Sequence, residues 1–362
     1  MGSVGRNEAL EVLRKLTIAG KAVKFPEHVM ALASLGKTGL SPTEAQLVVS
    51  SSRACLKEYS SGELVQFLKP VAQLPRKEML PIVVDVLKLL LSKPVESLSS
   101  EDALRLVSVC GRMRLYDSRL FDTLSPVVQV QSSSDLRRLL TACNRLSFCF
   151  TDSQRVLDSI EKFVAEEAEL RSVAIPSIEY LTRVTGVRIE KSFQACMNAL
   201  SRTVVELKRD DELIKQKSLV STDDVVRFLV CCGKIGRELE GSLSSSQKED
   251  LKFVLTKIVS YDLRNLELST LLKLFFSIEQ LEVFDDFFIR RRLVPAVVNA
   301  YMASAEKTPR DSLLVLTMAT KLPFKIPLMD DLIACVKDDL TRLPRDHELY
   351  EPVCAMIFQL SK

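Results

Sequence analysis

Residues 99–130 read SSEDALRLVSVCGRMRLYDSRLFDTLSPVVQV, and this stretch decides the fold class. From Ala103 to Cys110 the apolar residues have the spacing of one face of an α-helix. Ser100 is expected to cap this helix, with two acids in its first turn where the helix dipole favours negative charge. A break at Tyr116-Asp117 precedes a second helix. The residues that this second helix is expected to bury are Leu120, Phe121, Leu124, Val127 and Val128.

The same helical hairpin recurs at spacings of roughly 33 to 47 residues, longer and less regular than in tetratricopeptide repeats. The anchor of each repeat is the first residue expected to be buried in its leading helix. The anchors are Leu64, Ala103, Leu136, Ile178, Val225, Leu268 and Leu313, with Val29 as a weaker first member. Stacked hairpins of this kind bury a continuous core between neighbours. The sequence therefore predicts an all-α solenoid of about eight helical hairpins.

We expect three parts along the chain: an N-terminal helix in residues 1–26, the repeat array in 27–343 and a capping helix in 344–362. The array shows no clear internal domain boundary. The basic residues between positions 6 and 24 are compatible with a worn transit peptide or with a helix of the mature protein.

Composition excludes several classes of protein. The nine cysteines show no CxxC spacing, which indicates reduced core thiols and no metal site, and therefore predicts a reducing intracellular compartment as the location. No apolar run approaches the ~20 residues that a membrane helix needs, so no membrane span is expected. The net charge of +3 predicts by itself no affinity for nucleic acid or for a membrane surface.

Signatures of catalysis are sparse. The two histidines, His28 and His347, lie far apart in the sequence, and no phosphate-binding loop, nucleophile elbow or zinc-protease motif is present. Acidic pairs such as Asp223-Asp224 are expected on solvated helix faces. The sequence therefore predicts a protein without enzymatic activity and without a cofactor.

The informative pattern is the position of charge. Residues two, five and nine after an anchor point away from the buried face of a helix. In the second to seventh repeats these positions hold Gln66, Lys69, Gln73, Arg105, Ser108, Arg112, Arg138, Thr141, Arg145, Tyr180, Arg183, Val187, Arg227, Val230, Lys234, Thr270, Lys273 and Ser277. About half are basic and none is acidic. Because leading helices of a solenoid lie side by side, we expect a cationic surface suited to a phosphate backbone.

We call the basic members of this set the basic strip. They are Lys69, Arg105, Arg112, Arg138, Arg145, Arg183, Arg227, Lys234 and Lys273. A merely solvated helix face is the other interpretation, because Arg and Lys are good helix formers. The run Arg290-Arg291-Arg292 stands apart, as a solvated turn or as a contact to an acidic partner or RNA.

Residues 102–124, DALRLVSVCGRMRLYDSRLFDTL, resemble the heptatricopeptide and octotricopeptide repeats and the FAST-kinase-type helical repeats. Residues 281–288, LEVFDDFF, repeat the same break between helices, and the resemblance covers most of residues 60–305. It implies a mitochondrial role in RNA processing, RNA stability or ribosome assembly. Many such proteins end in a small RAP domain, whereas this chain is expected to end in helix, so the resemblance supports no catalytic function.

The expected function is RNA binding in an organellar RNA-processing or ribosomal assembly. The expected partners are single-stranded or ribosomal RNA, contacted through backbone phosphates, and other protein subunits of a ribonucleoprotein complex. The alternative is a non-catalytic scaffold subunit that binds proteins in a large complex.

Overall fold

The computed structural model describes residues 5–19, 24–36, 40–93, 98–166, 170–210, 220–236, 239, 243–261 and 263–361. Every regular element in these ranges is a helix, and they contain no β-strand. Within the same ranges, none of the helices has both the length and the apolar character to cross a membrane. The predicted fold class, an all-α solenoid of helical hairpins, is confirmed.

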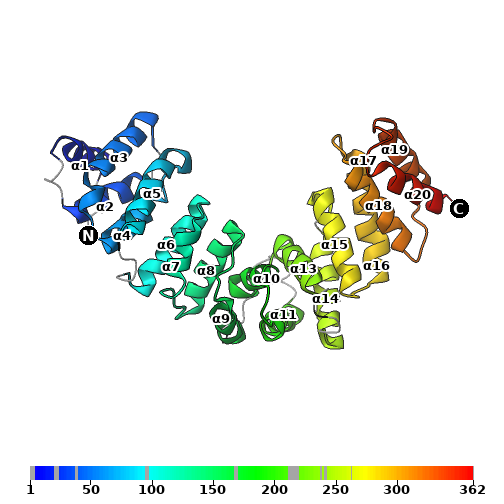
Figure 1. Cartoon of the computed structure of the whole chain (residues 1–362). Helices are drawn as coiled ribbons and strands as arrows, with labels where there is room; N and C mark the ends of the chain where they lie inside the picture. The colour runs from blue at the N-terminus through cyan, green and yellow to red at the C-terminus, as the bar shows by residue number, and fades with distance from the viewer. Residues whose placement is uncertain are drawn as a thin grey trace. The chain divides into compact units, whose positions relative to one another are not determined.

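The chain divides into two compact units, although the sequence shows no boundary. Unit 1 comprises Met1–Phe163 with Arg183–Val187, and unit 2 comprises Val164–Thr182 with Arg188–Lys362. Figure 1 labels the helices of both units.

Unit 1 stacks its helices in two layers. Its elements are α1 (Arg6–Ala19), α2 (Phe25–Leu35), α3 (Pro42–Cys55), η1 (Leu56–Glu58), α4 (Ser61–Val71), α5 (Arg76–Leu91), α6 (Ser100–Met113), α7 (Ser118–Leu124), α8 (Ser133–Leu146) and, as far as Phe163, α9 (Ser153–Glu166). The leading helices α2, α4, α6 and α8 each contact the next one, and α1, α3 and α5 form a second row in the same way. This is the stacking that the repeat pattern predicts.

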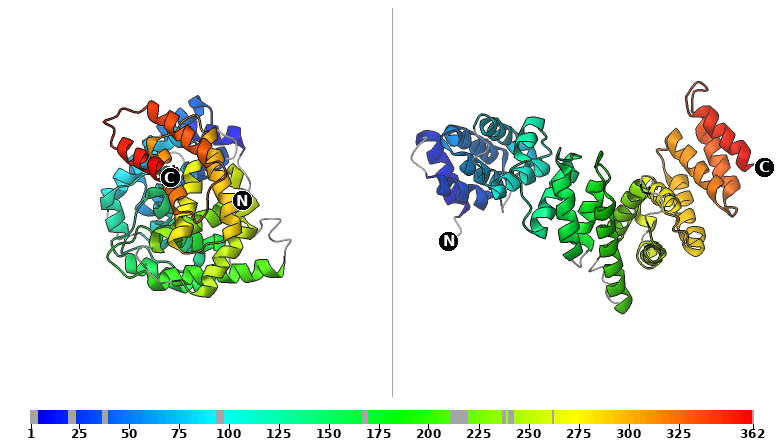
Figure 2. Two further views of the ribbon diagram at one scale, coloured as in Figure 1. Left: turned by 90° about the vertical axis from the view of Figure 1, so that its right-hand side faces the viewer. Right: turned by 60° about the horizontal axis from the view of Figure 1, so that its bottom comes forward.

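Unit 2 repeats the arrangement. Its elements are η3 (Leu170–Ala174), α10 (Ile175–Leu181), α11 (Glu190–Arg209), α13 (Thr222–Gly236), α14 (Ser245–Lys257), η4 (Val259–Tyr261), η5 (Leu263–Asn265), α15 (Leu268–Gln280), α16 (Asp286–Phe288), η6 (Ile289–Leu293), α17 (Val294–Ala303), α18 (Pro309–Lys321), α19 (Met329–Thr341) and α20 (Tyr350–Leu360). The leading helices α10, α13, α15 and α18 contact one another in order, and α20 packs on α18 as the next leading helix would. Figure 2 gives two further views of these helices.

Polar caps explain where the leading helices begin. Ser60 and Thr308 form capping boxes with Glu63 and Asp311 at the starts of α4 and α18. At α6 the cap is Ser99, whose hydroxyl accepts from the amide of Asp102, and not Ser100 as predicted. The Ser100 hydroxyl instead bonds the backbone of Gln129 in the segment after α7.

The buried positions follow the predicted register in most repeats. Leu64, Ala103, Leu136, Ile178 and Val225 are buried, whereas Leu268 and Leu313 are only half-buried. Both exceptions lie in the first turn of α15 or near the start of α18. The first buried layer of α15 is therefore formed by Leu271 and Leu272.

The second helix of the opening hairpin is shorter than predicted. Leu120, Phe121 and Leu124 are buried in α7, which ends at Leu124. Pro126 follows, and its ring cannot continue a helix without losing a backbone hydrogen bond. Val128 is still buried, and Val127 is half-buried, but both lie after the helix, where their amides bond back to the Leu124 carbonyl.

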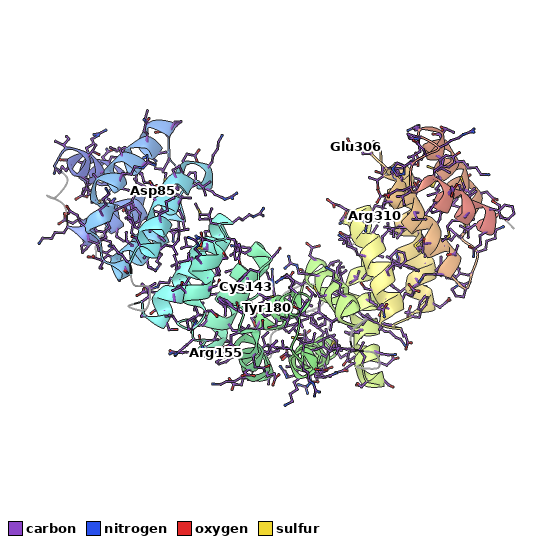
Figure 3. The ribbon with its side chains drawn as sticks, in the orientation of Figure 1. Asp85, Cys143, Arg155, Tyr180, Glu306 and Arg310 are labelled. Atoms are coloured by element: carbon purple, nitrogen blue, oxygen red, sulfur yellow. The ribbon has the colours of Figure 1, made fainter. Side chains whose placement is uncertain are left out.

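The fifth repeat departs most from the prediction. Its leading helix consists of the π-helix η3 followed by α10, which ends at Leu181. Pro176 lacks an amide hydrogen and crowds the carbonyl four residues earlier, inside η3, which favours the wider π turn. Tyr180 was expected to point outward but is fully buried (Figure 3). Arg183 and Val187 lie beyond the helix, so the expected outward face does not exist in this repeat.

Glycines let successive leading helices approach closely at two places. A Cβ atom on Gly111 of α6 would lie 2.6 Å from Cα of Ala142 in α8. A Cβ atom on Gly233 of α13 would lie 2.6 Å from Cβ of Ser277 in α15. Both distances are too short for any side chain larger than hydrogen. The approach also explains why Ser277, predicted to face outward, is buried.

Candidate nucleic-acid interface

In unit 1 the outward positions of three successive leading helices line one groove of about 440 Å³. Six of the nine positions predicted for repeats two to four take part. The groove is lined by Lys69 of α4 with Ala72 and Gln73 just after it, by Glu101, Arg105, Ser108, Val109 and Arg112 of α6, and by Arg138 of α8. We call it the unit 1 groove. The register derived from apolar anchors therefore places four cations of the basic strip together.

Unit 2 has an equivalent groove of about 690 Å³ on α13, α15 and α18. Its lining includes Val230, Gly233, Lys234, Ser269, Leu272, Lys273, Phe276, Ser277, Arg310, Asp311, Leu314, Thr317 and Lys321. We call it the unit 2 groove. Four predicted positions line it, including Lys234 and Lys273 of the basic strip. Arg310 (Figure 3) and Lys321 add two cations from α18 that the register of the sequence did not include.

Intrahelical ion pairs neutralise part of the positive charge in unit 1. A nitrogen of Arg105 lies 2.5 Å from Glu101 Oε1 and another lies 3.3 Å from Asp102 Oδ1. Arg138 lies 3.6 Å from Asp135 Oδ1. These acids stand three or four residues before the arginines, in the first helical turn. Exposed pairs of this kind are worth little to stability, but they reduce the charge available to a ligand.

Two cations of the unit 1 groove have no ion-pair partner among the residues that the structure describes. Lys69 and Arg112 are exposed, and no carboxylate of a described residue lies within 4 Å of either. Arg112 Nη1 lies 3.5 Å from the carbonyl oxygen of Ala72, which holds its guanidinium over the groove. Lys69 and Arg112 are thus the residues of the groove best prepared to meet a phosphate.

In the unit 2 groove fewer of the cations are paired with acids. Lys234, Lys273 and Arg310 are exposed, without a carboxylate partner among the residues that the structure describes. Lys321 pairs with Glu279, and Asp311 is engaged in the cap of α18.

Three members of the basic strip lie outside both grooves. Arg145 is exposed near the end of α8. Arg183 donates to the side-chain oxygen of Asn144 within unit 1. Arg227 Nε lies 3.0 Å from Glu179 Oε1 on the preceding leading helix of unit 2. The structure therefore concentrates the strip in two grooves and leaves these three residues elsewhere.

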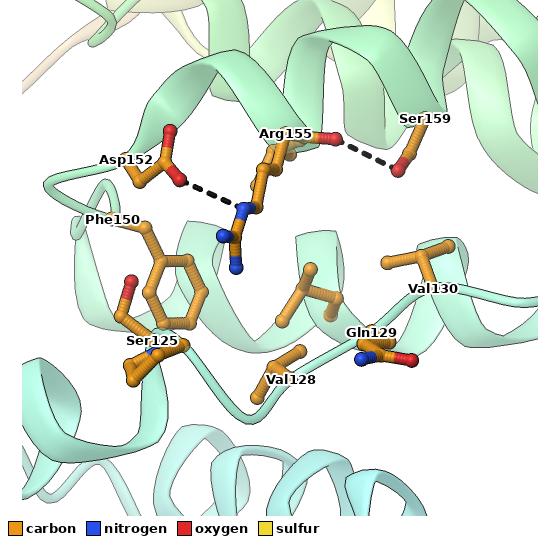
Figure 4. Close-up of a pocket in the computed structure, with 11 residues that line it drawn as sticks. Ser125, Val128, Gln129, Val130, Phe150, Asp152, Arg155 and Ser159 are labelled. Carbon is orange, nitrogen blue, oxygen red and sulfur yellow. Dashed lines mark hydrogen bonds and ion pairs between the residues drawn. The ribbon is translucent and has the colours of Figure 1, made fainter.

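Another hollow of unit 1, of about 360 Å³, lies between α9 and the segment after α7 (Figure 4). Its arginine, Arg155, lies 2.9 Å from Asp152 Oδ2, and the backbone carbonyl of Arg155 accepts from the Ser159 hydroxyl. Its walls include Phe150 and Val128. With its cation paired, this hollow offers an anion much less than the unit 1 groove.

The cysteines offer no reactive site in the interior. None of the nine forms a disulfide, and Cys110 and Cys143 are fully buried. Burial raises the pKa of each of these two thiols to about 12, so both stay protonated at neutral pH. Across the part of the chain that the structure describes, no three His, Cys, Asp or Glu side chains gather as metal ligands would.

Comparison with known proteins does not assign the chain to a family. No protein-family model matches the sequence, and a search of curated proteins finds no significant match.

Proposed function

We propose that this protein binds single-stranded RNA through its phosphate backbone, with the unit 1 groove as the principal contact. The observation that carries the proposal is the convergence of Lys69, Arg105, Arg112 and Arg138 from three successive helices on one groove. Guanidinium and ammonium groups at such positions contact phosphates without reading sequence. Few aromatic rings accompany these cations, so base stacking contributes little and the binding is not strongly sequence-selective.

The unit 2 groove supplies a second cationic contact in this proposal, through Lys234 and Lys273. The role is one of binding without catalysis. From the resemblance to organellar helical-repeat proteins alone, we place the RNA in mitochondria, in RNA processing, RNA stability or ribosome assembly. Imaging of a tagged protein together with a mitochondrial marker tests the location.

A charge-reversal pair tests the unit 1 groove. We expect Lys69→Glu combined with Arg112→Glu to weaken binding of a labelled uridine oligomer by at least about tenfold at low salt. Each phosphate contact on a single strand contributes ~0.7 to the slope of log affinity against log salt, so the slope should fall by about 1.4. Filter-binding titrations at several salt concentrations measure both quantities.

Lys77→Glu combined with Lys88→Glu is the matched control. Both lysines are exposed on α5 of unit 1 and neither lines the groove, so the net charge changes equally. The control should keep its affinity within about twofold. An equal loss in the control would show that only net charge matters, and the groove would lose its role.

The second candidate function, a protein-interaction scaffold, is favoured by the floor of the unit 2 groove. Leu272, Phe276 and Leu314 line it together with the cations above. An apolar floor with a basic rim fits an acidic amphipathic helix. Absence of RNA binding at low salt, with binding of an acidic amphipathic peptide that is lost in Lys234→Glu, would favour the scaffold over the RNA-binding protein.

A further inference from the structure

A pocket of about 750 Å³ in unit 2 gathers three arginines at a place distinct from both grooves. Arg264 reaches it from η5, and Arg291 and Arg292 reach it from η6. All three are exposed, and no carboxylate of a described residue lies within 4 Å of any of them. None of the described side chains that line the pocket is acidic. We call it the arginine pocket.

The local backbone explains why Arg291 and Arg292 line the pocket whereas Arg290 does not. Pro295 lacks an amide hydrogen and crowds the carbonyl of Arg291 four residues earlier, which favours the π-helical turn of η6. Arg291 and Arg292 then line the pocket. Arg290 instead lies 3.2 Å from Asp286 Oδ1, with its guanidinium carbon 4.4 Å from the centre of the Phe324 ring.

The other walls of the pocket suit a flat organic group. Ala296, Ala300 and Ala303 follow one another at helical spacing on one face of α17 and line the pocket with Leu263. Small side chains in this pattern form a shelf against which a planar ring can lie. The volume lies within the range of ligand sites and exceeds what a phosphate ion alone fills.

We propose that the arginine pocket binds a nucleoside 5′-phosphate, either free or as the 5′ end of an RNA. The phosphomonoester dianion lies among Arg264, Arg291 and Arg292, because guanidinium groups bind phosphate oxygens in pairs of parallel hydrogen bonds. The base lies on the alanine shelf of α17. This site does not depend on the unit 1 groove, and it gives the arginine run a role that the RNA-backbone proposal leaves unused.

Calorimetric titration of the full chain with adenosine 5′-monophosphate tests the proposal. We expect binding of the nucleotide, competition by inorganic phosphate and an affinity for adenosine at least about tenfold weaker. Three single substitutions, Arg264→Ala, Arg291→Ala and Arg292→Ala, should each weaken nucleotide binding about tenfold, as loss of a charged hydrogen bond does. Circular dichroism melting of each variant confirms that it is folded.

Arg290→Ala is the matched control, since Arg290 belongs to the same run but does not line the pocket. It should bind the nucleotide within about twofold of the unaltered chain. An equal loss in Arg290→Ala, equal affinity for adenosine, or binding of neither the nucleotide nor 5′-phosphorylated RNA would overturn the proposal. A phosphoserine peptide that binds more tightly than the nucleotide would also overturn it, because the site would then belong to a phosphoprotein.

A uridine oligomer with and without a 5′-phosphate separates the two sources. A preference for the phosphorylated oligomer, lost in Arg291→Ala, supports the RNA end, and equal or tighter binding of the free nucleotide supports a mononucleotide. The Lys69→Glu, Arg112→Glu protein should bind the nucleotide normally. Failure of the unit 1 groove and failure of the arginine pocket are therefore distinguishable.

Discussion

Replacing Gly111 by Ala should destabilise the protein by about 2 kcal/mol, although Ala is the better helix former. The new methyl group would stand 2.6 Å from Cα and 2.7 Å from Cβ of Ala142, so α6 and α8 must move apart. Overpacking of this kind costs about 3 kcal/mol, while the gain in helix propensity offsets about 1 kcal/mol. The midpoint of urea unfolding, followed by circular dichroism, measures the difference.

Gly62→Ala is the control for Gly111→Ala. Gly62 lies in the first turn of α4, and the nearest atom to its Cβ position is Asp102 Oδ2 at 3.9 Å. Here the propensity gain is unopposed, so we expect a stabilisation of about 0.5 kcal/mol. The same substitution thus has opposite signs at the two positions. If both substitutions stabilised the protein, the close approach of α6 and α8 would be contradicted.

The close approach also bears on function. Gly111 precedes Arg112, and the helices that meet at Gly111 and Ala142 carry Arg105, Arg112 and Arg138 into the unit 1 groove. Separating α6 from α8 spreads these cations. Gly111→Ala should therefore weaken RNA binding as well as stability, whereas Gly62→Ala should leave RNA binding unchanged.

Acid should destabilise the protein through one buried residue, His28. Its side chain is fully buried, and burial lowers its pKa from the usual 6.5 to about 4. The unfolded chain therefore takes up a proton below about pH 6.5, whereas the folded chain does not until about pH 4. Stability from this group is complete above pH 6.5 and falls by about 3 kcal/mol as the pH decreases to 4.

The neighbours of His28 do not titrate in that range. His28 Nδ1 lies 2.8 Å from the Tyr59 hydroxyl, which donates to Cys55 Sγ at 3.1 Å, and the Cys55 thiol lies within 3.5 Å of the Ser51 carbonyl. Burial raises the pKa of both Cys55 and Tyr59. With the proton on Nδ1, His28, Tyr59 and Cys55 each donate to an acceptor in this run of hydrogen bonds. Nε2 is then unprotonated, and it is buried without a hydrogen-bond partner.

His28→Asn provides the comparison, because its amide nitrogen can stand in for Nδ1 but does not titrate. Urea unfolding at pH 7 and at pH 4 measures the free energy of unfolding of both proteins. The variant is less stable at pH 7, but its loss between the two pH values should be smaller by about 3 kcal/mol. Parallel curves for the two proteins would place the acid sensitivity elsewhere.

The charge pattern of unit 1 shows how far local reasoning reaches. The outward positions of α4, α6 and α8 were predicted because helical periodicity is local, and none of those nine residues is buried. The pairing of Arg105 with Glu101 and Asp102 was also readable, since residues three and four apart on a helix are neighbours. The basic strip does not include this pairing, because the strip is defined by outward positions and not by the acids of the first turn.

Other features depend on residues that are distant in the sequence. Arg227 pairs with Glu179, and Ser277 is buried against Gly233, in both cases across adjacent leading helices. Arg310 and Lys321 join Lys234 and Lys273 because α18 packs on α15. Arg264 meets Arg291 and Arg292 because α17 packs against η5. No periodicity within one helix contains this information.

Local sequence patterns were enough to predict most of the helical segments, the buried face of most leading helices, and the bases on the opposite face in unit 1. These properties follow from capping, helical period and the removal of apolar surface from water, which act over a few turns of chain. Which of those bases stand together, which are paired with acids and where the chain divides into two units depend on the three-dimensional packing of the helices. Helix-to-helix distance and the stagger between neighbouring hairpins set those outcomes, because both arise from packing between residues tens of positions apart.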